Sequence, residues 1–251
     1  MFDAALLFLA GIVGGMLNAV AGGGTFITFP ALVFTGVPPV IANATTTVAA
    51  LPGYLAAAIG FRHELRAGRD LPLVKLTLWT MLGGTVGCLL LLISSNAAFA
   101  ALVPFLLLAA TVIFYWAEPI RHHAARWRSA VAPFGLGTLL PVAIYGGYFN
   151  GGLGIVMLAV FAMWGMQDLH LMNGLKSWLS FALALIALAV FAIGGKIVWG
   201  PAAVMSAGTI IGGYAGAPVA RRIPRRALRL LIAAVGFGMT AIFFWRLVNG
   251  A

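Results

Sequence analysis

The side chains best suited to chemistry in this chain are polar groups that stand inside long apolar stretches. An asparagine is followed by polar residues three and four positions later in each half, and this spacing places them on one face of a helix. They are Asn43, Thr46 and Thr47 in the first half, and Asn173, Lys176, Ser177 and Ser180 in the second. Amides, hydroxyls and one ammonium suit the binding of an anion. They do not include a nucleophile–base pair for covalent catalysis.

Glycine clusters precede both polar stripes. Each cluster interrupts an apolar run, and glycine is poorly suited to a helix interior. A helix that starts after such a break directs unpaired N–H groups and its positive dipole end back at the break, which favours an anion. The predicted cradles are Gly22, Gly23, Gly24 and Thr25, and Gly151, Gly152 and Gly154, flanked by Asn18 and Asn150. The alternatives are that the glycines only permit close helix packing and that the polar stripes only join helices.

Lys176 allows two interpretations. It could extend to the cytoplasmic surface along its apolar stem, or it could supply a fixed positive charge to an anion. All five acidic residues lie at segment ends or in loops, so none is available to neutralise a buried lysine. The same distribution argues against a carboxylate-based cation or proton pathway. The five are Asp3, Glu64, Asp70, Glu118 and Asp168.

Composition identifies an integral membrane protein. The 251 residues are 63% hydrophobic and 8% charged, and the mean hydropathy is +1.07. The net charge of +10 does not indicate nucleic-acid binding, because eleven of the fifteen basic residues gather in three short loops. That clustering is the positive-inside pattern of cytoplasmic loops. The single cysteine, Cys88, and the absence of metal or nucleotide motifs predict no cofactor and no metal site.

Ten apolar runs follow along the chain. About 20 helical residues are needed to cross a bilayer, and runs 23–36 and 152–165, which follow the glycine clusters, are too short. The complete set is 4–20, 23–36, 39–61, 71–94, 97–116, 130–149, 152–165, 168–194, 200–220 and 230–248.

An internal repeat accounts for this set of runs. A shift of 129 residues places Trp116 on Trp245, Pro72 on Pro201, and the first glycine cluster on the second. We therefore predict a first membrane repeat at 1–120, a basic cytoplasmic linker at 121–129 and a second membrane repeat at 130–251. Each contains a broken helical hairpin, at 4–36 or 130–165, and three transmembrane helices.

The positions of the arginines predict the topology. If the three basic loops face the cytoplasm, helix 39–61 runs inward and its counterpart 168–194 runs outward. The repeats are then inverted, and each hairpin must begin and end on one side. The expected fold is all-α, with hairpin tips approaching from opposite faces and both termini outside the inner cell membrane.

Several segments carry a family resemblance over nearly the whole chain. AGGGTFITFPAL and ANATTT stand in the first half, GGYFNGGLGIVML and MNGLKSWLS in the second, and GGYAGAPVARRIPRRALR near the end. With these motifs the chain resembles the TauE/SafE family, the sulfite exporter or toluene-sulfonate uptake permease type. The resemblance implies transport of a small sulfur-containing anion, such as sulfite or an organosulfonate.

The leading functional hypothesis is a secondary transporter of a small anion that works by alternating access between the repeats. A passive anion channel would use the same residues. An enzyme and a non-transporting scaffold have less in the sequence to favour them. The expected partners are the anion and the lipid bilayer. A homodimer stays open, because glycine-rich runs 83–87 and 212–216 could pack within a chain or between chains.

Overall fold

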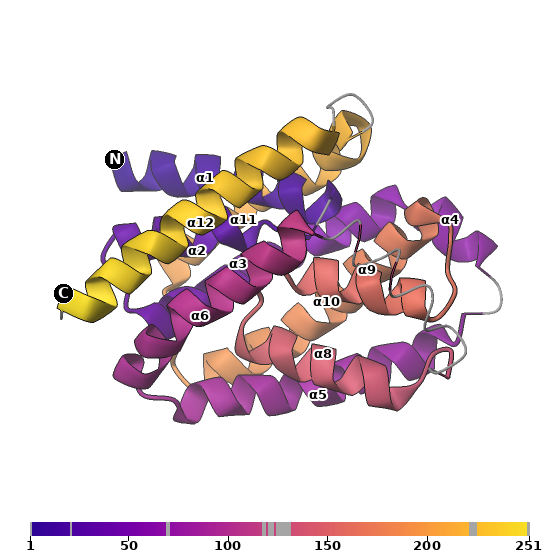
Figure 1. Ribbon diagram of the computed structural model, residues 1–251, viewed down its shortest axis with the longest axis horizontal. Helices are drawn as coiled ribbons and strands as arrows, with labels where there is room; N and C mark the ends of the chain where they lie inside the picture. Colours follow the sequence, from indigo (N-terminus) through magenta and orange to yellow (C-terminus); the bar gives the residue numbers. More distant parts are fainter. Residues whose placement is uncertain are drawn as a thin grey trace.

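The computed structural model describes residues 2–20, 22–68, 71–116, 119, 123, 132–220 and 225–249. Within these ranges the chain is helical, and Figure 1 shows the helices running mostly along the long axis. Five of them are long and apolar enough to cross a membrane. They are α1 (Phe2–Val20), α3 (Pro39–Gly60), α5 (Leu73–Ile93), α6 (Asn96–Tyr115) and α10 (Leu169–Ile193).

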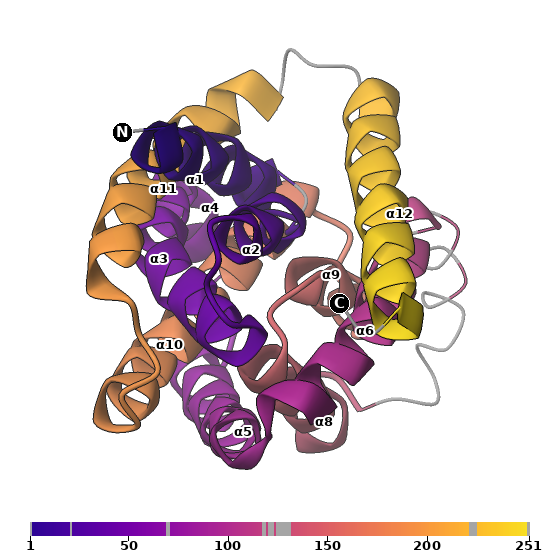
Figure 2. The same ribbon diagram turned by 90° about the vertical axis from the view of Figure 1, so that its left-hand side faces the viewer.

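Two short helices lie between the long ones, as Figure 2 shows. Helix α2 (Thr25–Phe34) has 10 residues and α9 (Leu153–Met163) has 11, so each is only about 15 Å long. Both end on a left-handed glycine, Gly36 with φ 86° and Gly165 with φ 87°. In each case the residue after the glycine donates its N–H to the backbone carbonyl five residues earlier, which is the Schellman pattern. These hydrogen-bonded C-terminal ends explain why both helices end before they are long enough to cross a bilayer.

The remaining helices are α4 (Arg62–Ala67), α8 (Leu136–Tyr148), α11 (Trp199–Ala220) and α12 (Arg225–Asn249). Three of them differ from expectation. Helix α4 forms where a loop was expected, α8 is shorter than run 130–149, and α12 begins before residue 230. The predicted linker at 121–129 lies outside the described residues, apart from His123.

Helix packing joins distant parts of the chain in matching pairs. Helix α1 packs on α11, α8 on α5, α3 on α10, and α6 on α12. The N- and C-terminal ends lie at one end of the molecule in Figure 1, and α4 lies at the other. Many apolar side chains on these helices face outward, including Val74, Ile93 and Ile193. An apolar exterior of this kind suits lipid.

Glycine-rich runs make the closest of these packings possible. A Cβ on Gly87 of α5 would overlap the backbone of Ile144 and Tyr148 in α8, and one on Gly212 of α11 would overlap Ile12 of α1. Both runs therefore pack within the chain. This is the small-residue packing typical of membrane helices. A homodimer stays a prediction, and these glycines no longer argue for it.

Two glycines of α11 offer a matched test of this packing. Gly212→Ala drives a methyl group into the Ile12 carbonyl, whereas Gly200 has nothing within 4 Å of an added Cβ. We expect Gly212→Ala to lower stability by about 1–3 kcal/mol through overpacking and Gly200→Ala to leave it unchanged or slightly raised. Thermal unfolding in detergent measures both. Equal melting temperatures for the two variants would contradict the assigned packing.

Candidate functional site

The two glycine breaks meet inside the protein. An added Cβ on Gly22 would overlap Gly154, and one on Gly154 would lie 2.5 Å from the Gly22 Cα. The Thr25 hydroxyl lies 3.5 Å from the carbonyl oxygen of Asn150, which adds a long polar contact between the breaks. The expectation that the hairpin tips approach each other therefore agrees with the geometry. Most of the predicted site residues gather around this contact.

Both breaks turn through a left-handed glycine. Gly22 has φ 79° and Gly152 has φ 74°, a region that side-chain-bearing residues avoid. Residues 22–24 connect into α2, and residues 149–152 connect α8 to α9. The backbone conformation therefore requires glycine at both positions, independently of any ligand.

The two breaks differ in how their N–H groups are used. In the first, Asn18 Oδ1 accepts a 2.8 Å hydrogen bond from the Gly24 N–H, so Asn18 supports the turn. In the second, the described residues provide no hydrogen-bond acceptor for the N–H groups of Gly151, Gly152 and Gly154. The N–H of Gly22 in the first break also has an acceptor, the Leu17 carbonyl at 2.9 Å. The second break thus keeps the donors that an anion would need, whereas the first has already used two of its own.

Lys176 lies directly beside the contact between the breaks. Its side chain is 1% exposed, so the interpretation that it extends to the surface is wrong. Its Nζ donates to Asn173 Oδ1 at 2.7 Å and to the Ala19 carbonyl at 3.3 Å. An added Cβ on Gly154 would lie 3.0 Å from its Cδ.

The charge of this lysine has no carboxylate partner among the described residues. Ala19 belongs to the last turn of α1, where the helix dipole is negative and favours a cation. Asp168, the acid nearest in sequence, instead caps α10 by accepting from the backbone N–H groups of His170 and Leu171. A buried ammonium held only by neutral oxygens retains net charge that an anion can neutralise.

The polar stripe of α3 faces the second break. Asn43 Nδ2 donates to the Tyr148 carbonyl at 2.9 Å, and Thr47 donates to the Asn43 carbonyl at 2.9 Å. Buried side-chain oxygens at Asn43, Thr46 and Asn150 have no hydrogen-bond partner within the described structure. This surface of α3 is therefore polar and incompletely satisfied.

The end of the α10 stripe is less well placed. Ser177 has a buried hydroxyl without a partner in the described residues, and the Ser180 hydroxyl donates a long hydrogen bond to the Met157 sulfur at 4.0 Å. Neither touches the two breaks through a hydrogen bond. Their predicted role in binding stays a prediction.

The cluster also contains two tyrosines that the sequence motifs did not indicate. Asn150 Nδ2 donates to the Tyr54 hydroxyl at 3.1 Å, and the Tyr145 hydroxyl donates to the Gly151 carbonyl at 2.5 Å. Tyr54 continues the Asn43–Thr47 stripe seven residues beyond Thr47, so helical spacing could have indicated it. Tyr145 lies in an apolar run and carried no such signal.

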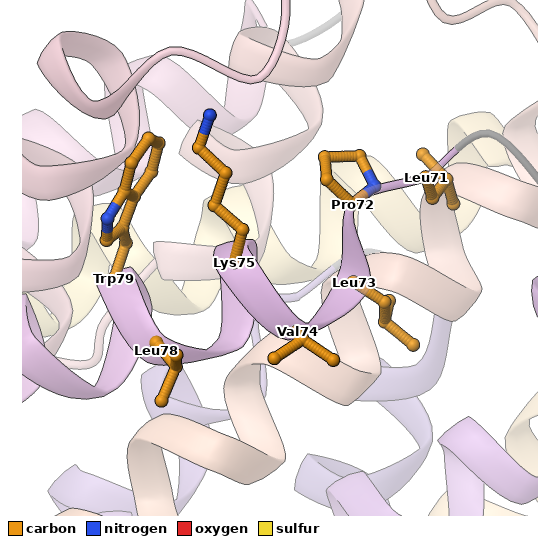
Figure 3. A pocket seen from close by; sticks show the side chains of 7 residues that line it. All are labelled: Leu71, Pro72, Leu73, Val74, Lys75, Leu78 and Trp79. Carbon is orange, nitrogen blue, oxygen red and sulfur yellow. The ribbon is translucent and has the colours of Figure 1, made fainter.

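A separate surface hollow lies at the start of α5. Its lining residues run from Leu71 to Trp79, and Figure 3 shows the Lys75 side chain beside the Trp79 ring. The Lys75 Nζ lies 4.4 Å from the ring centroid, in a cation–π contact. None of the predicted site residues lines this hollow, so the buried contact of the two breaks remains the candidate site.

Comparisons with known proteins place the chain in a family of membrane proteins. The model of the family described as Sulfite exporter TauE/SafE matches residues 7–243. A Haemophilus influenzae "Probable membrane transporter protein" is 32% identical, over 94% of this chain and 92% of its own length. No solved structure matches the chain significantly.

More distant relatives have similar names. A Sinorhizobium sp. "Probable membrane transporter protein ORF9" is 28% identical, over 94% of this chain and 90% of the relative. The Escherichia coli K12 "Probable membrane transporter protein YfcA" is 26% identical, over 94% and 87%. The matches span nearly the full length of each of these relatives. This chain therefore belongs to the sulfite exporter TauE/SafE family of membrane proteins.

Proposed function

We propose that this membrane transporter carries a small anion by alternating access, and that the anion binds where the two glycine breaks meet. The observation that carries the proposal is Lys176, a buried ammonium beside both breaks without a carboxylate partner in the described chain. The family suggests a sulfur-containing anion, sulfite or an organosulfonate. Such ions present several oxygen acceptors to N–H and ammonium donors.

Hydrogen-bond donors at the site come from both halves. Lys176 and the N–H groups of the second break belong to the second half, and Thr25 at the start of α2 belongs to the first. Anion binding between broken helices is the arrangement used by other secondary transporters, where half-helix N-termini point at the substrate. A ligand held by both halves would respond to any movement of one against the other.

The helix partners support two inverted repeats. Exchanging each helix for its counterpart 129 residues along turns the α1–α11 contact into the α8–α5 contact, and turns α3–α10 into itself. Such an exchange is what an approximate two-fold axis between the halves produces. Inverted repeats of this kind allow a bundle to open to either side by exchanging the conformations of its halves.

The ends of the molecule support the proposed topology. Arg62 and Arg66 lie in or beside α4, at the end opposite the two termini in Figure 1. We infer that this basic end is cytoplasmic, by the positive-inside pattern, and that both termini are outside. The basic residues at 69, 121, 126, 128, 221 and 222 lie outside the described residues.

Lys176 can be tested against a matched surface lysine. We expect Lys176→Ala to reduce sulfite or sulfonate flux into liposomes by about tenfold or more, because a charge-assisted hydrogen bond contributes about 1.5–3 kcal/mol. Lys176→Arg keeps the charge and should retain more flux than Lys176→Ala. Lys75→Ala, on the outer face of α5, should transport like the wild type.

Size-exclusion chromatography shows whether each variant is folded. Wild-type flux in a folded Lys176→Ala variant would remove Lys176 from the mechanism. Recordings in planar bilayers separate a carrier from the channel alternative, since only a channel gives unitary anion currents. Such currents would replace alternating access while keeping the same binding residues.

Single cysteines test the topology. Cys88 is fully buried, so the native thiol should not react with a labelling reagent from either side of the membrane. We expect His63→Cys, beside the basic end, to react with an impermeant maleimide only in inside-out vesicles. Ala97→Cys, in the first turn of α6, should react in intact cells. The reverse pattern would invert the proposed orientation.

A further inference from the structure

Each half of the chain donates a side-chain hydrogen bond to the C-terminal end of the first hairpin helix of the other half. Lys176 of the second half donates to the Ala19 carbonyl near the end of α1, at 3.3 Å. Asn43 of the first half donates to the Tyr148 carbonyl at the end of α8, at 2.9 Å. The negative end of α1 therefore receives a full positive charge from the protein. The negative end of α8 receives only a neutral amide.

The repeat identifies which residue stands in place of the lysine. Aligning Asn43 with Asn173 is a shift of 130 residues, one more than the shift of 129 that aligns Gly36 with Gly165, so it needs a one-residue gap between these anchors. With this gap Thr46 falls on Lys176, three residues further along each helix. A threonine side chain is shorter than a lysine side chain and has no charge. The Thr46 hydroxyl is buried and without a partner among the described residues, whereas its neighbour Thr47 donates to the Asn43 carbonyl.

Two further oxygens accompany Thr46. Because the Tyr148 carbonyl can only accept, it takes the Asn43 NH₂ group and leaves Asn43 Oδ1 without a partner in the described structure. Asn150 donates through Nδ2 to Tyr54, and its Oδ1 is likewise unpartnered. The segment from Tyr148 to Asn150 is thus bonded to α3 at both ends. Helix α3 and this segment, joined by the two hydrogen bonds, form one buried seam that carries all three unpartnered oxygens.

The chemistry of this seam suits a small monovalent cation. Amide, hydroxyl and carbonyl oxygens are hard ligands, and the C-terminal end of a helix adds negative potential. Helices α3, α8 and α9 contain no charged residue, so the seam lacks the carboxylates that usually hold a divalent ion. In broken-helix transporters, unwound carbonyls and helix C-termini are the groups that bind Na⁺.

We propose that Asn43 Oδ1, Thr46 Oγ1 and Asn150 Oδ1 form a sodium site at the end of α8, where the ion takes the place that the Lys176 ammonium occupies at the end of α1. Binding at this site satisfies three buried oxygens that otherwise lack a partner. The ion would be a co-substrate beside the anion site. This last step, coupling, rests on the proposed anion transport, but the site itself does not.

Sodium binding can be measured without any anion substrate. The wild type should unfold about 5 °C higher in saturating NaCl than in choline chloride of equal ionic strength, with a smaller rise in KCl. Thr46→Val removes only the hydroxyl and should abolish the sodium-specific rise. Thr80→Val removes another buried, unpartnered hydroxyl, on α5 outside the seam, and should keep the rise.

Two outcomes would overturn the site. One is equal melting temperatures of the wild type in all three salts, which would mean that the seam holds only water. The other is an undiminished sodium response in a folded Thr46→Val variant. Thr46→Lys provides an independent check, since an ammonium at this place should make the melting temperature independent of sodium.

Flux measurements separate this proposal from the anion proposal. With sulfite or a sulfonate that the wild type carries, an inward sodium gradient should increase uptake severalfold in the wild type and in Thr80→Val, but not in Thr46→Val. Anion flux that ignores sodium in the wild type would overturn the coupling alone. A sodium-specific melting shift without any anion flux would leave the site supported and contradict the anion proposal.

Discussion

The rest of this structure depends on one constraint: broken backbone in a membrane must find its hydrogen-bond partners inside the protein. The chain breaks two helices near their middle, so four helix ends lie away from water. It resolves this by bringing the breaks together at Gly22 and Gly154 and surrounding them with polar side chains. Asn18 and Asn43 satisfy individual backbone groups with hydrogen bonds of 2.8 and 2.9 Å. The long helices around the breaks exclude lipid.

The same constraint produces the asymmetry of the site. Two copies of one hairpin would present equal ends, but the alignment of Asn43 with Asn173 pairs Lys176 with Thr46 of the first half. A buried lysine without a carboxylate is expensive unless a ligand or a helix end compensates its charge. The last turn of α1 provides part of this compensation through the Ala19 carbonyl. The contrast gives one half a fixed charge and leaves the other half with neutral oxygens.

Close helix packing holds this arrangement in place. The glycines of α5 and α11 let α8 and α1 approach until backbone meets backbone, as at Gly87 and Gly212. Van der Waals contact of this kind, more than hydrophobic burial, drives association between helices in lipid. The first helix of each hairpin is thus clamped against a long helix of the opposite half, and the two breaks are held in contact as a consequence.

The sequence by itself determined the membrane class, the family and the places where helices break, because apolar length, charge clusters and left-handed glycines are local properties. It also indicated Lys176 and the stripes of Asn43 and Asn173, but it left open where those side chains point. Only the tertiary structure decided that Lys176 is buried against the end of α1, that Asn18 supports its own turn, and that Tyr54 and Tyr145 join the cluster. Those outcomes depend on contacts between residues up to 157 positions apart, and helical spacing carries no information about contacts between separate helices.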